Sequence, residues 1–181
     1  IAMAFSSSIT EGASIIAPLD PLFCPPALWN RAYVQSVCAS GEGVPLVIGI
    51  ERELGYRSRF ETIVSATADA DTLRYVERIV KFLLWARGGW KLTVGGPKSI
   101  GDYISKTYST RGARKFDCEM MARSYGKPFQ VIVTTAAKVP QNKDMQIRVG
   151  GHLKGCRIGF DLGASDYKVS AVINGEAVFT E

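Results

Sequence analysis

Five residues near the end of the 181-residue chain have properties suited to a bound phosphate group. Asp161 could hold a hydrated Mg²⁺, because that ion keeps most of its waters and takes few protein carboxylates. Gly163 would let the chain turn tightly into Ala164 and would expose backbone N–H groups as an anion-binding concavity. Ser165 can donate its hydroxyl to a phosphate oxygen, and Lys168 can add a mobile positive charge. These five residues predict a nucleotide-binding loop, with Asp161 as its metal ligand and with no catalytic residue of its own.

The loop is expected to join two β-strands. Residues 157–160 form a short apolar run that predicts a buried strand ending at Asp161, and residues 168–173 alternate with a period of two. Asn174-Gly175 favours a two-residue turn with positive φ at both positions, followed by a third strand over residues 176–180. The DLGAS letters also fit an ordinary turn between two strands of any antiparallel sheet, because Asp, Gly and Ser are common turn residues.

The order strand, Asp-x-Gly-x-Ser, strand and hairpin resembles the first phosphate loop of the actin-like ATPase superfold. Within that superfold, DLGAS-x-x-K followed by the Asn-Gly-Glu hairpin is most similar to the ROK family of bacterial sugar kinases. The resemblance implies ATP and Mg²⁺ as cofactors and phosphoryl transfer to a sugar hydroxyl as the reaction. In the family pattern two glycines stand where this chain has Gly163 and Ala164, and threonine stands where it has Ser165.

The resemblance also has implications for the organisation of the chain. In that family the phosphate loop normally opens the polypeptide, and the catalytic aspartate and the sugar-binding and zinc-binding residues follow downstream of it. An added N-terminal domain is therefore implied here, with residues 151–181 as the truncated start of the ATPase domain. We expect the 181-residue chain by itself to be inactive, and the natural polypeptide to be longer.

The upstream part is expected to be an accessory α/β domain over residues 27–150. An extended or disordered lead over residues 1–26 precedes it, because four prolines fall within residues 18–26. The combination of a β-hairpin with strand–helix alternation predicts an α/β, mixed-sheet layered domain, followed by the first β-hairpin strands of an actin-like ATPase (ribonuclease H-like) lobe. Apolar periodicity predicts helices at 27–39, 71–87, about 100–108 and 113–125, and strands at 44–50, 60–64, 90–94 and 129–134.

Three features of the accessory domain bear on its role. Gly95-Gly96, between a strand and a helix, weakly resembles the element that packs on adenosine in the superfold. A tight strand-to-helix turn with Pro97 at the first helical position is the preferred interpretation of this motif. Trp85 and Trp90 are expected to fill the core, and residues 138–148 have the composition of a polar linker.

Composition and charge exclude several classes of protein. The net charge of +5 is modest, and the basic residues are interspersed with acidic ones rather than forming a stripe with aromatics, which argues against nucleic-acid binding. No run approaches the roughly 18 apolar residues that span a bilayer, so no membrane partner is expected. The four cysteines lie far apart without a zinc or disulfide spacing, and we expect them to be reduced, buried hydrophobes of a cytoplasmic protein: Cys24, Cys38, Cys118 and Cys156.

Two classes of function stay open from sequence. The first is the ATP-dependent sugar kinase, which would take nucleotide and sugar as ligands. The second is a noncatalytic binding or interaction domain in which DLGAS is only a structural turn. His152, the one histidine, has no acidic partner that would make it a catalytic base. Nucleotide dependence separates the two hypotheses, and homo-oligomerisation is compatible with either.

Overall fold

The computed structural model describes residues 15, 17–20, 23–144 and 150–181. The chain divides into two compact units, Ile1–Met145 and Gln146–Glu181, which are described separately. Most of the predicted lead lies outside the described residues. The division falls near residue 145, a few residues before the predicted domain boundary at 150.

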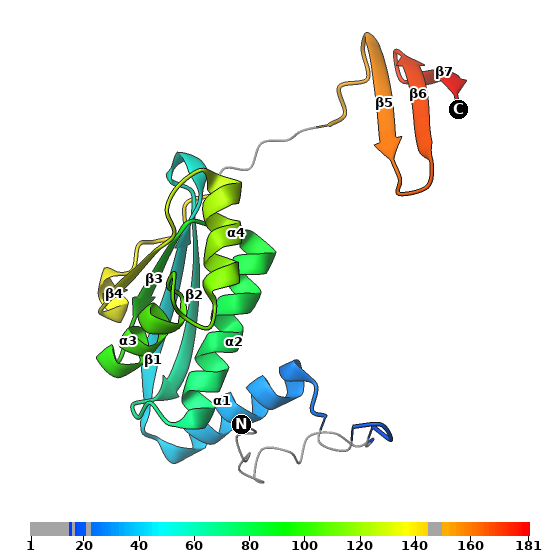
Figure 1. The fold of residues 1–181 in the computed structure, drawn as a ribbon. Helices are drawn as coiled ribbons and strands as arrows, with labels where there is room; N and C mark the ends of the chain where they lie inside the picture. The colour runs from blue at the N-terminus through cyan, green and yellow to red at the C-terminus, as the bar shows by residue number, and fades with distance from the viewer. Residues whose placement is uncertain (1–14, 16, 21–22, 145–149) are drawn as a thin grey trace. The chain divides into compact units, whose positions relative to one another are not determined.

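The larger unit is an α/β domain built on a mixed sheet, as the sequence predicts (Figure 1). Its four strands lie in the order β2-β1-β3-β4, with β1 antiparallel to both β2 and β3, and β3 parallel to β4. The parallel pair is joined through two helices, the long connection that parallel strands require. Its elements are α1 (Pro26–Ser40), β1 (Gly43–Glu51), η1 (Glu53–Gly55), β2 (Arg57–Ser65), α2 (Ala70–Arg87), β3 (Lys91–Gly95), α3 (Lys98–Thr107), α4 (Lys115–Tyr125), β4 (Gln130–Thr134) and η2 (Ala136–Lys138).

Helix α2 forms where the apolar periodicity is strongest. Asp69 caps its first turn by accepting a 2.8 Å hydrogen bond from the Thr72 backbone N–H. Gly88 ends the helix with a φ of 70°, which a glycine adopts without steric cost. The helix predicted at residues 71–87 is therefore confirmed, with a cap at its first turn and a glycine at its end.

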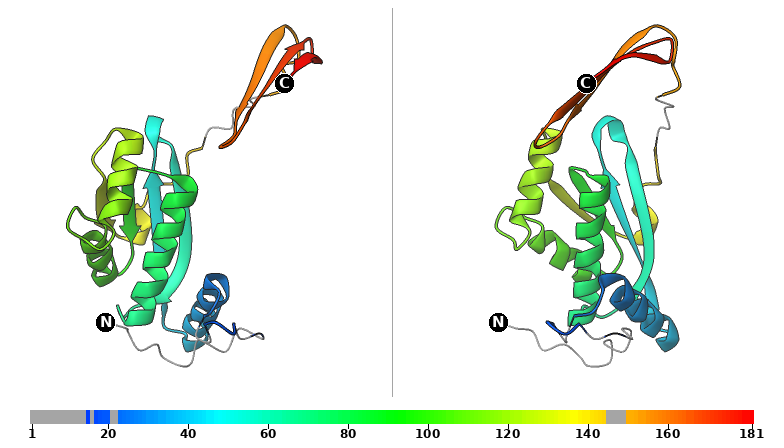
Figure 2. Two further views of the ribbon diagram at one scale, coloured as in Figure 1. Left: turned by 45° about the vertical axis from the view of Figure 1, so that its right-hand side comes forward. Right: turned by 90° about the vertical axis from the view of Figure 1, so that its right-hand side faces the viewer.

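The helices α2 and α4 lie against the same side of the sheet (Figure 2). Alternate residues of β1 point to that side, and the other strands and helices add apolar side chains to one continuous cluster. No helix within the described ranges is long and apolar enough to cross a membrane. The fully buried side chains of this core include Leu46, Ile48, Ile50, Val64, Val76, Val80, Leu84, Leu92, Val94, Ile100 and Ile104.

A segment after β4 covers the opposite side of the sheet. Val139 is 2% exposed and fills a notch where a Cβ on Gly49 would lie 2.8 Å from its Cγ1 and a Cβ on Gly95 would collide with its Cγ2. Arg59 Nη1 donates to the Val139 carbonyl, and Arg57 and Lys143 exchange two backbone hydrogen bonds of 3.0 Å. The prediction of a polar linker is therefore wrong for residues 138–144, while residues 145–148 lie outside the described ranges.

Two further expectations about side chains need correction. Trp85 is 49% exposed, so it does not fill the core. Trp90 is half-buried, and its indole N–H donates to the Arg52 carbonyl at 3.2 Å. Among the cysteines only Cys118 is buried; Cys24 is half-buried, and Cys38 and Cys156 are exposed. A single sequence cannot reveal this difference, because cysteine fits core and surface alike.

The smaller unit is a three-stranded antiparallel sheet in the order β5-β6-β7, made of β5 (Cys156–Leu162), β6 (Tyr167–Ile173) and β7 (Glu176–Thr180). Asn174 has a φ of 51° and Gly175 a φ of 90°, so the predicted two-residue turn with positive φ at both positions is confirmed. The Asn174 side chain also accepts a 2.9 Å hydrogen bond from the Gly155 backbone N–H. All three predicted strands are present.

The notch around Val139 gives a stability prediction. A Cβ at Gly49 meets only the end of the Val139 side chain at short range, whereas a Cβ at Gly95 also meets the Thr135 carbonyl oxygen at 2.7 Å and Ala136 Cα at 3.0 Å. We expect either alanine substitution to lower the free energy of unfolding, by about 1–3 kcal/mol, because overpacking forces atoms apart. Urea denaturation measures the change.

A double-mutant comparison identifies the contact responsible. In a Val139→Ala background, Gly49→Ala should become nearly neutral, while Gly95→Ala should keep most of its cost because the backbone atoms of Thr135 and Ala136 remain. Equal rescue of both substitutions would contradict this packing.

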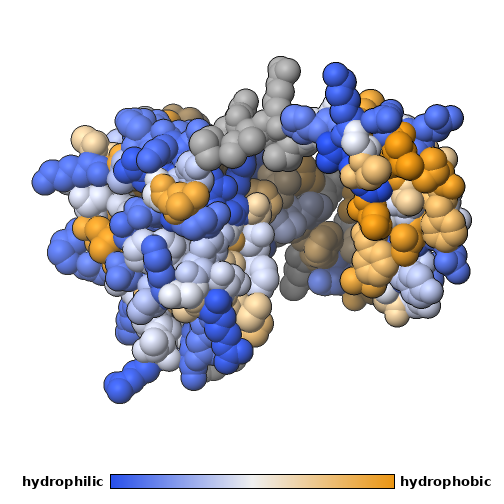
Figure 3. Space-filling model, turned by 90° about the horizontal axis from the view of Figure 1, so that it is seen from above, coloured by the Kyte–Doolittle hydropathy of each residue, from blue (hydrophilic) through white to orange (hydrophobic). Residues whose placement is uncertain are grey.

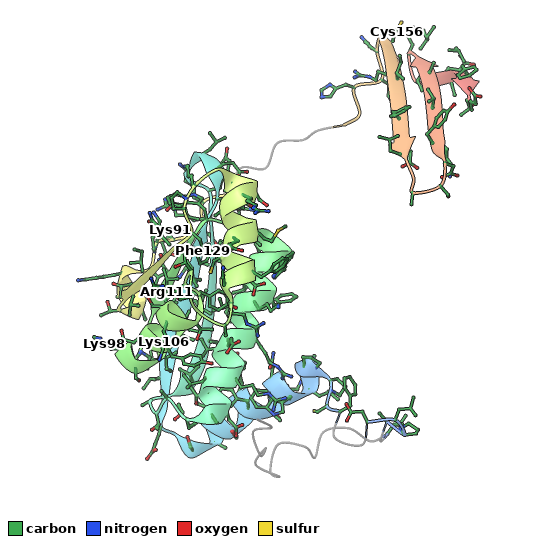
Figure 4. All side chains as sticks on the ribbon, viewed as in Figure 1. Lys91, Lys98, Lys106, Arg111, Phe129 and Cys156 are labelled. Carbon is green, nitrogen blue, oxygen red and sulfur yellow. The ribbon has the colours of Figure 1, made fainter. Side chains whose placement is uncertain are left out.

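Thiol accessibility gives a second prediction. Burial, reinforced by the neighbouring Asp117 carboxylate, raises the pKa of the Cys118 thiol to about 11. Figure 4 labels Cys156 in the small sheet, where its side chain is exposed. With iodoacetamide at pH 8, Cys38 and Cys156 should be alkylated in the folded protein and Cys118 only after denaturation, because the thiolate is the nucleophile. Peptide mass spectrometry measures each site, and rapid alkylation of Cys118 in the folded protein would refute its burial.

Candidate functional site

The candidate phosphate loop is the connection between β5 and β6. The ladder ends at the pair Leu162 and Tyr167, so residues 163–166 form the loop. The Gly163 backbone N–H donates a 2.8 Å hydrogen bond to the Asp166 carbonyl oxygen, which closes the loop at its base. The sequence-predicted turn is therefore present, and it is short and closed.

Glycine is needed at position 163 because a larger side chain would not fit there. Its φ is not in the left-handed region. A Cβ at this position would collide with Asp166 Oδ1 and would lie 3.0 Å from the Asp166 carbonyl oxygen. The Asp166 side chain thus folds back over Gly163, and glycine lets the two ends of the loop approach each other.

The tip of the loop leaves hydrogen-bond donors available. Within residues 150–181 the backbone N–H groups of Ala164 and Ser165 donate to no other residue, and both side chains are exposed. Consecutive amide groups together with the Ser165 hydroxyl could therefore donate to one anion. The Ala164 methyl group stands beside these amides, where the family pattern has a glycine.

Asp161 and Lys168 face each other directly across the β5–β6 ladder. They lie on the same face of the sheet as Arg157 and Ser170, because alternate residues of a strand point to the same side. Neither charged side chain forms an ion pair within 4.0 Å in this part of the structure. The sheet thus presents a polar face with a carboxylate and an ammonium group beside the loop.

The other face of the small sheet is apolar. The prediction that β5 is a buried strand is not met by its side chains, all of which are exposed, with Phe160 at 61%. Figure 3 shows hydrophobic residues gathered on this sheet. A three-stranded sheet offers too little area to bury such side chains within itself. The apolar residues on this face are Cys156, Ile158, Phe160, Leu162, Tyr167, Val169, Ala171, Ile173 and Phe179, and Glu176, paired with Ile173, shares the face at its edge.

The donor set fits a weakly held magnesium ion rather than a protein-enclosed metal site. No group of three or more His, Cys, Asp or Glu side chains gathers anywhere in the described ranges. Mg²⁺ is commonly held by one or two carboxylates together with substrate phosphates and water. Asp161, exposed beside a loop with free amides, matches that pattern, and its ligation of a metal remains a prediction.

The Gly95-Gly96 motif is a packing turn. The space above Gly95 is taken by Val139, Thr135 and Ala136, and a Cβ on Gly96 would lie 2.8 Å from Leu46 Cδ1. Helix α3 starts at Lys98, so Pro97 occupies its N-cap position and not the first helical position predicted for it. The chain itself therefore occupies the space directly beside both glycines.

A half-buried polar network links α2 to α3 and to the connection between α3 and α4. Glu77 accepts hydrogen bonds from the Tyr103 hydroxyl at 2.7 Å and from Arg114 Nε at 2.7 Å. Burial, together with the bond to Glu77, raises the pKa of the Tyr103 hydroxyl. Because these groups form hydrogen bonds with one another, the network holds the helices together and offers no free acid or base.

Sequence reasoning missed one pocket. It has a volume of about 130 Å³ and lies beside β2, where a polar rim surrounds an apolar floor. The rim brings together residues from distant parts of the chain, so no local motif could reveal it. Its lining is Ile48, Ile50, Ser58, Arg59, Phe60, Leu83, Arg87, Asn142 and Asp144.

Comparison with known proteins yields no match to a family model, a curated protein or a solved structure.

The closed loop makes a prediction of its own. Gly163→Ala should open it, because the new methyl group collides with the Asp166 carboxylate. We expect the amide hydrogen at position 163 to exchange with solvent at least about tenfold faster, since its hydrogen bond is lost. Gly159→Ala is the matched control in the preceding strand β5, because its nearest neighbour, the Ser170 carbonyl oxygen, lies at 3.8 Å. Equal exchange in both variants would show that the loop is not closed in this way.

Proposed function

We propose that residues 151–181 open the nucleotide-binding lobe of an ATP-dependent sugar kinase of the ROK type, with residues 27–150 as an accessory domain. The observation that carries the proposal is the β5–β6 loop, whose free amides and Ser165 hydroxyl stand beside the Asp161 carboxylate. The Asn174-Gly175 hairpin follows it, in the order of elements that the family resemblance implies.

The residues would divide the work according to their chemistry. Asp161 would bind Mg²⁺, which when bound with ATP neutralises phosphate charge and orients the transferred group. The amides of Ala164 and Ser165 and the Ser165 hydroxyl would donate to phosphate oxygens. Lys168, opposite Asp161 in the ladder, would add positive charge beside them.

The apolar face of the small sheet is what we would expect if this sheet packed inside a larger lobe. Its side chains need further apolar surface to pack against, which the remainder of an actin-like lobe would supply. In the family, the catalytic aspartate and the sugar-binding residues belong to that remainder. On this proposal the kinase activity would need those residues as well as the phosphate loop, and an enzyme that draws on cellular ATP would act in the cytoplasm.

The decisive experiment uses the protein expressed from its gene to the natural stop codon. Asp161→Asn keeps the shape of the side chain and loses the charge that balances the metal. Because Asp161 is exposed and outside any core, the melting temperature should stay close to that of the parent. ATP-dependent phosphorylation of a panel of hexoses should fall by about 10² or more in kcat/KM.

Glu176→Gln is the control, because it removes an acid from the start of β7, the third strand of the same sheet, and should leave the rate unchanged. Normal sugar phosphorylation by the Asp161→Asn variant would show that DLGAS is only a structural turn. The same conclusion would follow if the parent protein bound no nucleotide, which would favour the noncatalytic interaction domain.

A further inference from the structure

Strand β4 forms one edge of the four-stranded sheet, and no other strand of the described residues lies on its outer side. The Gln130 backbone N–H donates to the Trp90 carbonyl at 2.9 Å, toward β3. Because the backbone groups of successive strand residues point alternately to the two sides, those of Val131 and Val133 point away from the sheet. Within the described ranges neither residue has a hydrogen-bond partner on that side.

The opposite edge of the sheet, β2, is protected in ways that β4 is not. Arg57 exchanges two backbone hydrogen bonds with Lys143, and the Arg59 N–H donates to the Asn142 side chain. Strand β2 also carries charged side chains, which native proteins place on edge strands to prevent unwanted pairing. Strand β4, with the sequence QVIVT, has no charge, proline or glycine, and its register with β3 has no bulge. The domain therefore leaves one edge open to a further strand.

The side chains of β4 hold this edge in a fixed conformation. Val131 packs against the core cluster, and Val133 packs against α3, where a Cβ on Gly101 would collide with its Cγ1. Ile132 points to the opposite side of the sheet and is 44% exposed. An edge that is already ordered loses little conformational entropy when a second strand pairs with it.

We propose that β4 pairs antiparallel with β4 of a second copy of this chain, about a two-fold axis at Ile132, so that the two domains share one continuous sheet. This register pairs all five residues of the strand. Val131 lies opposite Val133 of the second copy, and each such pair exchanges both of its N–H···O bonds. The two Ile132 residues form a non-hydrogen-bonded pair with Cα atoms about 4.5 Å apart. This association is independent of the proposed kinase activity.

Self-complementarity favours a second copy as the partner. In the proposed register apolar residues face apolar residues and Gln130 faces Thr134, so the strand brings no like charges together. The lysines that flank β4 in sequence are directed elsewhere. Lys127 Nζ lies 4.6 Å from the centroid of the Trp90 ring, on the β3 side, and Lys138 belongs to η2, which folds back onto β3 and β1.

The charges of α3, the helix that packs on β4, are also compatible with this pairing. Lys98 and Asp102 form an ion pair of 2.5 Å, so their charges balance. Lys106 lies three residues after Tyr103 and so shares a side of the helix with it. The Tyr103 hydroxyl donates to Glu77 of α2, which places that side toward α2 and away from the open edge.

The first test measures the exchange of backbone amide hydrogens by NMR in the intact 181-residue chain. Pairing through five residues makes a small interface, so association should be micromolar and is compared at about 20 µM and about 1 mM. The Val131 and Val133 amides should exchange about threefold or more slowly at the higher concentration, by mass action. The Ile132 amide, which points toward β3, should be protected equally at both.

The second test changes the residue at the two-fold axis. Ile132→Lys and Ile132→Glu each place like charges directly opposite each other, so each variant alone should be monomeric in sedimentation equilibrium. An equal mixture of the two should dimerise, because opposite charges then face each other. Ile63→Lys is the matched control, since Ile63 of β2 lies on the same side of the sheet and is 41% exposed; this variant should associate like the parent.

Several outcomes would overturn the proposal. Protection of the Val131 and Val133 amides at both concentrations would mean that a segment of the same chain occupies the edge. Self-association that leaves both amides unprotected would assign the contact to another surface, such as the apolar face of the small sheet. A mixture that stays monomeric although both variants melt like the parent, or an equal loss of association in Ile63→Lys, would exclude this register. If an Ile132 variant fails to fold, the exchange measurement on the unmodified chain decides.

Discussion

The packing of α2 against the inner face of the sheet is the interaction on which the larger unit depends. Val76, Val80 and Leu84 are completely buried, and so are the β1 and β3 side chains that they share a core with. The sheet is only four strands wide, so the loss of this helix would expose its apolar face along its length. Surface features of the domain, including the orientation of Trp85 and the pocket beside β2, also depend on this helix.

The opposite side of the sheet is covered in a different way. There Gly49 and Gly95 leave room close to the strands, and the Val139 side chain packs against both of them. This arrangement lets an irregular segment lie close to the strands, where a regular helix would be too wide. Arg59 then serves two roles, because its guanidinium binds the Val139 carbonyl and its backbone N–H donates to Asn142 Oδ1 at 2.6 Å. The segment is thereby fixed by packing at one end and by hydrogen bonds at the other.

Local patterns in the sequence predict the elements of both units well. The periodicity of α2 and the Asn174-Gly175 turn each depend on residues close together in the chain, and both predictions are confirmed. Contacts between distant segments were beyond that reasoning. Val139 looks like part of a polar linker until the two glycines opposite it are known, and Trp85 looks like core until Asp117 is seen to hold it at the surface.

The same limit applies to the candidate site, where the residues can be named from sequence but their surroundings cannot. DLGAS and Gly95-Gly96 are both glycine-containing turns that follow a strand, and the sequence alone gives each a nucleotide-related interpretation. What distinguishes them is the occupant of the space beside the glycine. At Gly95 that space is filled by Val139 and by backbone from residues 135 and 136.

At Gly163 the crowding comes only from Asp166 within the loop, and the next two amides point to no protein acceptor in the small unit. A backbone N–H that the fold leaves unpaired at the surface is available to a ligand, whereas one enclosed by side chains is not. The case for phosphate binding therefore rests on the free amides of Ala164 and Ser165 more than on the glycine itself. It follows that the Ala164 methyl group, beside these amides, sets how closely a phosphate could approach.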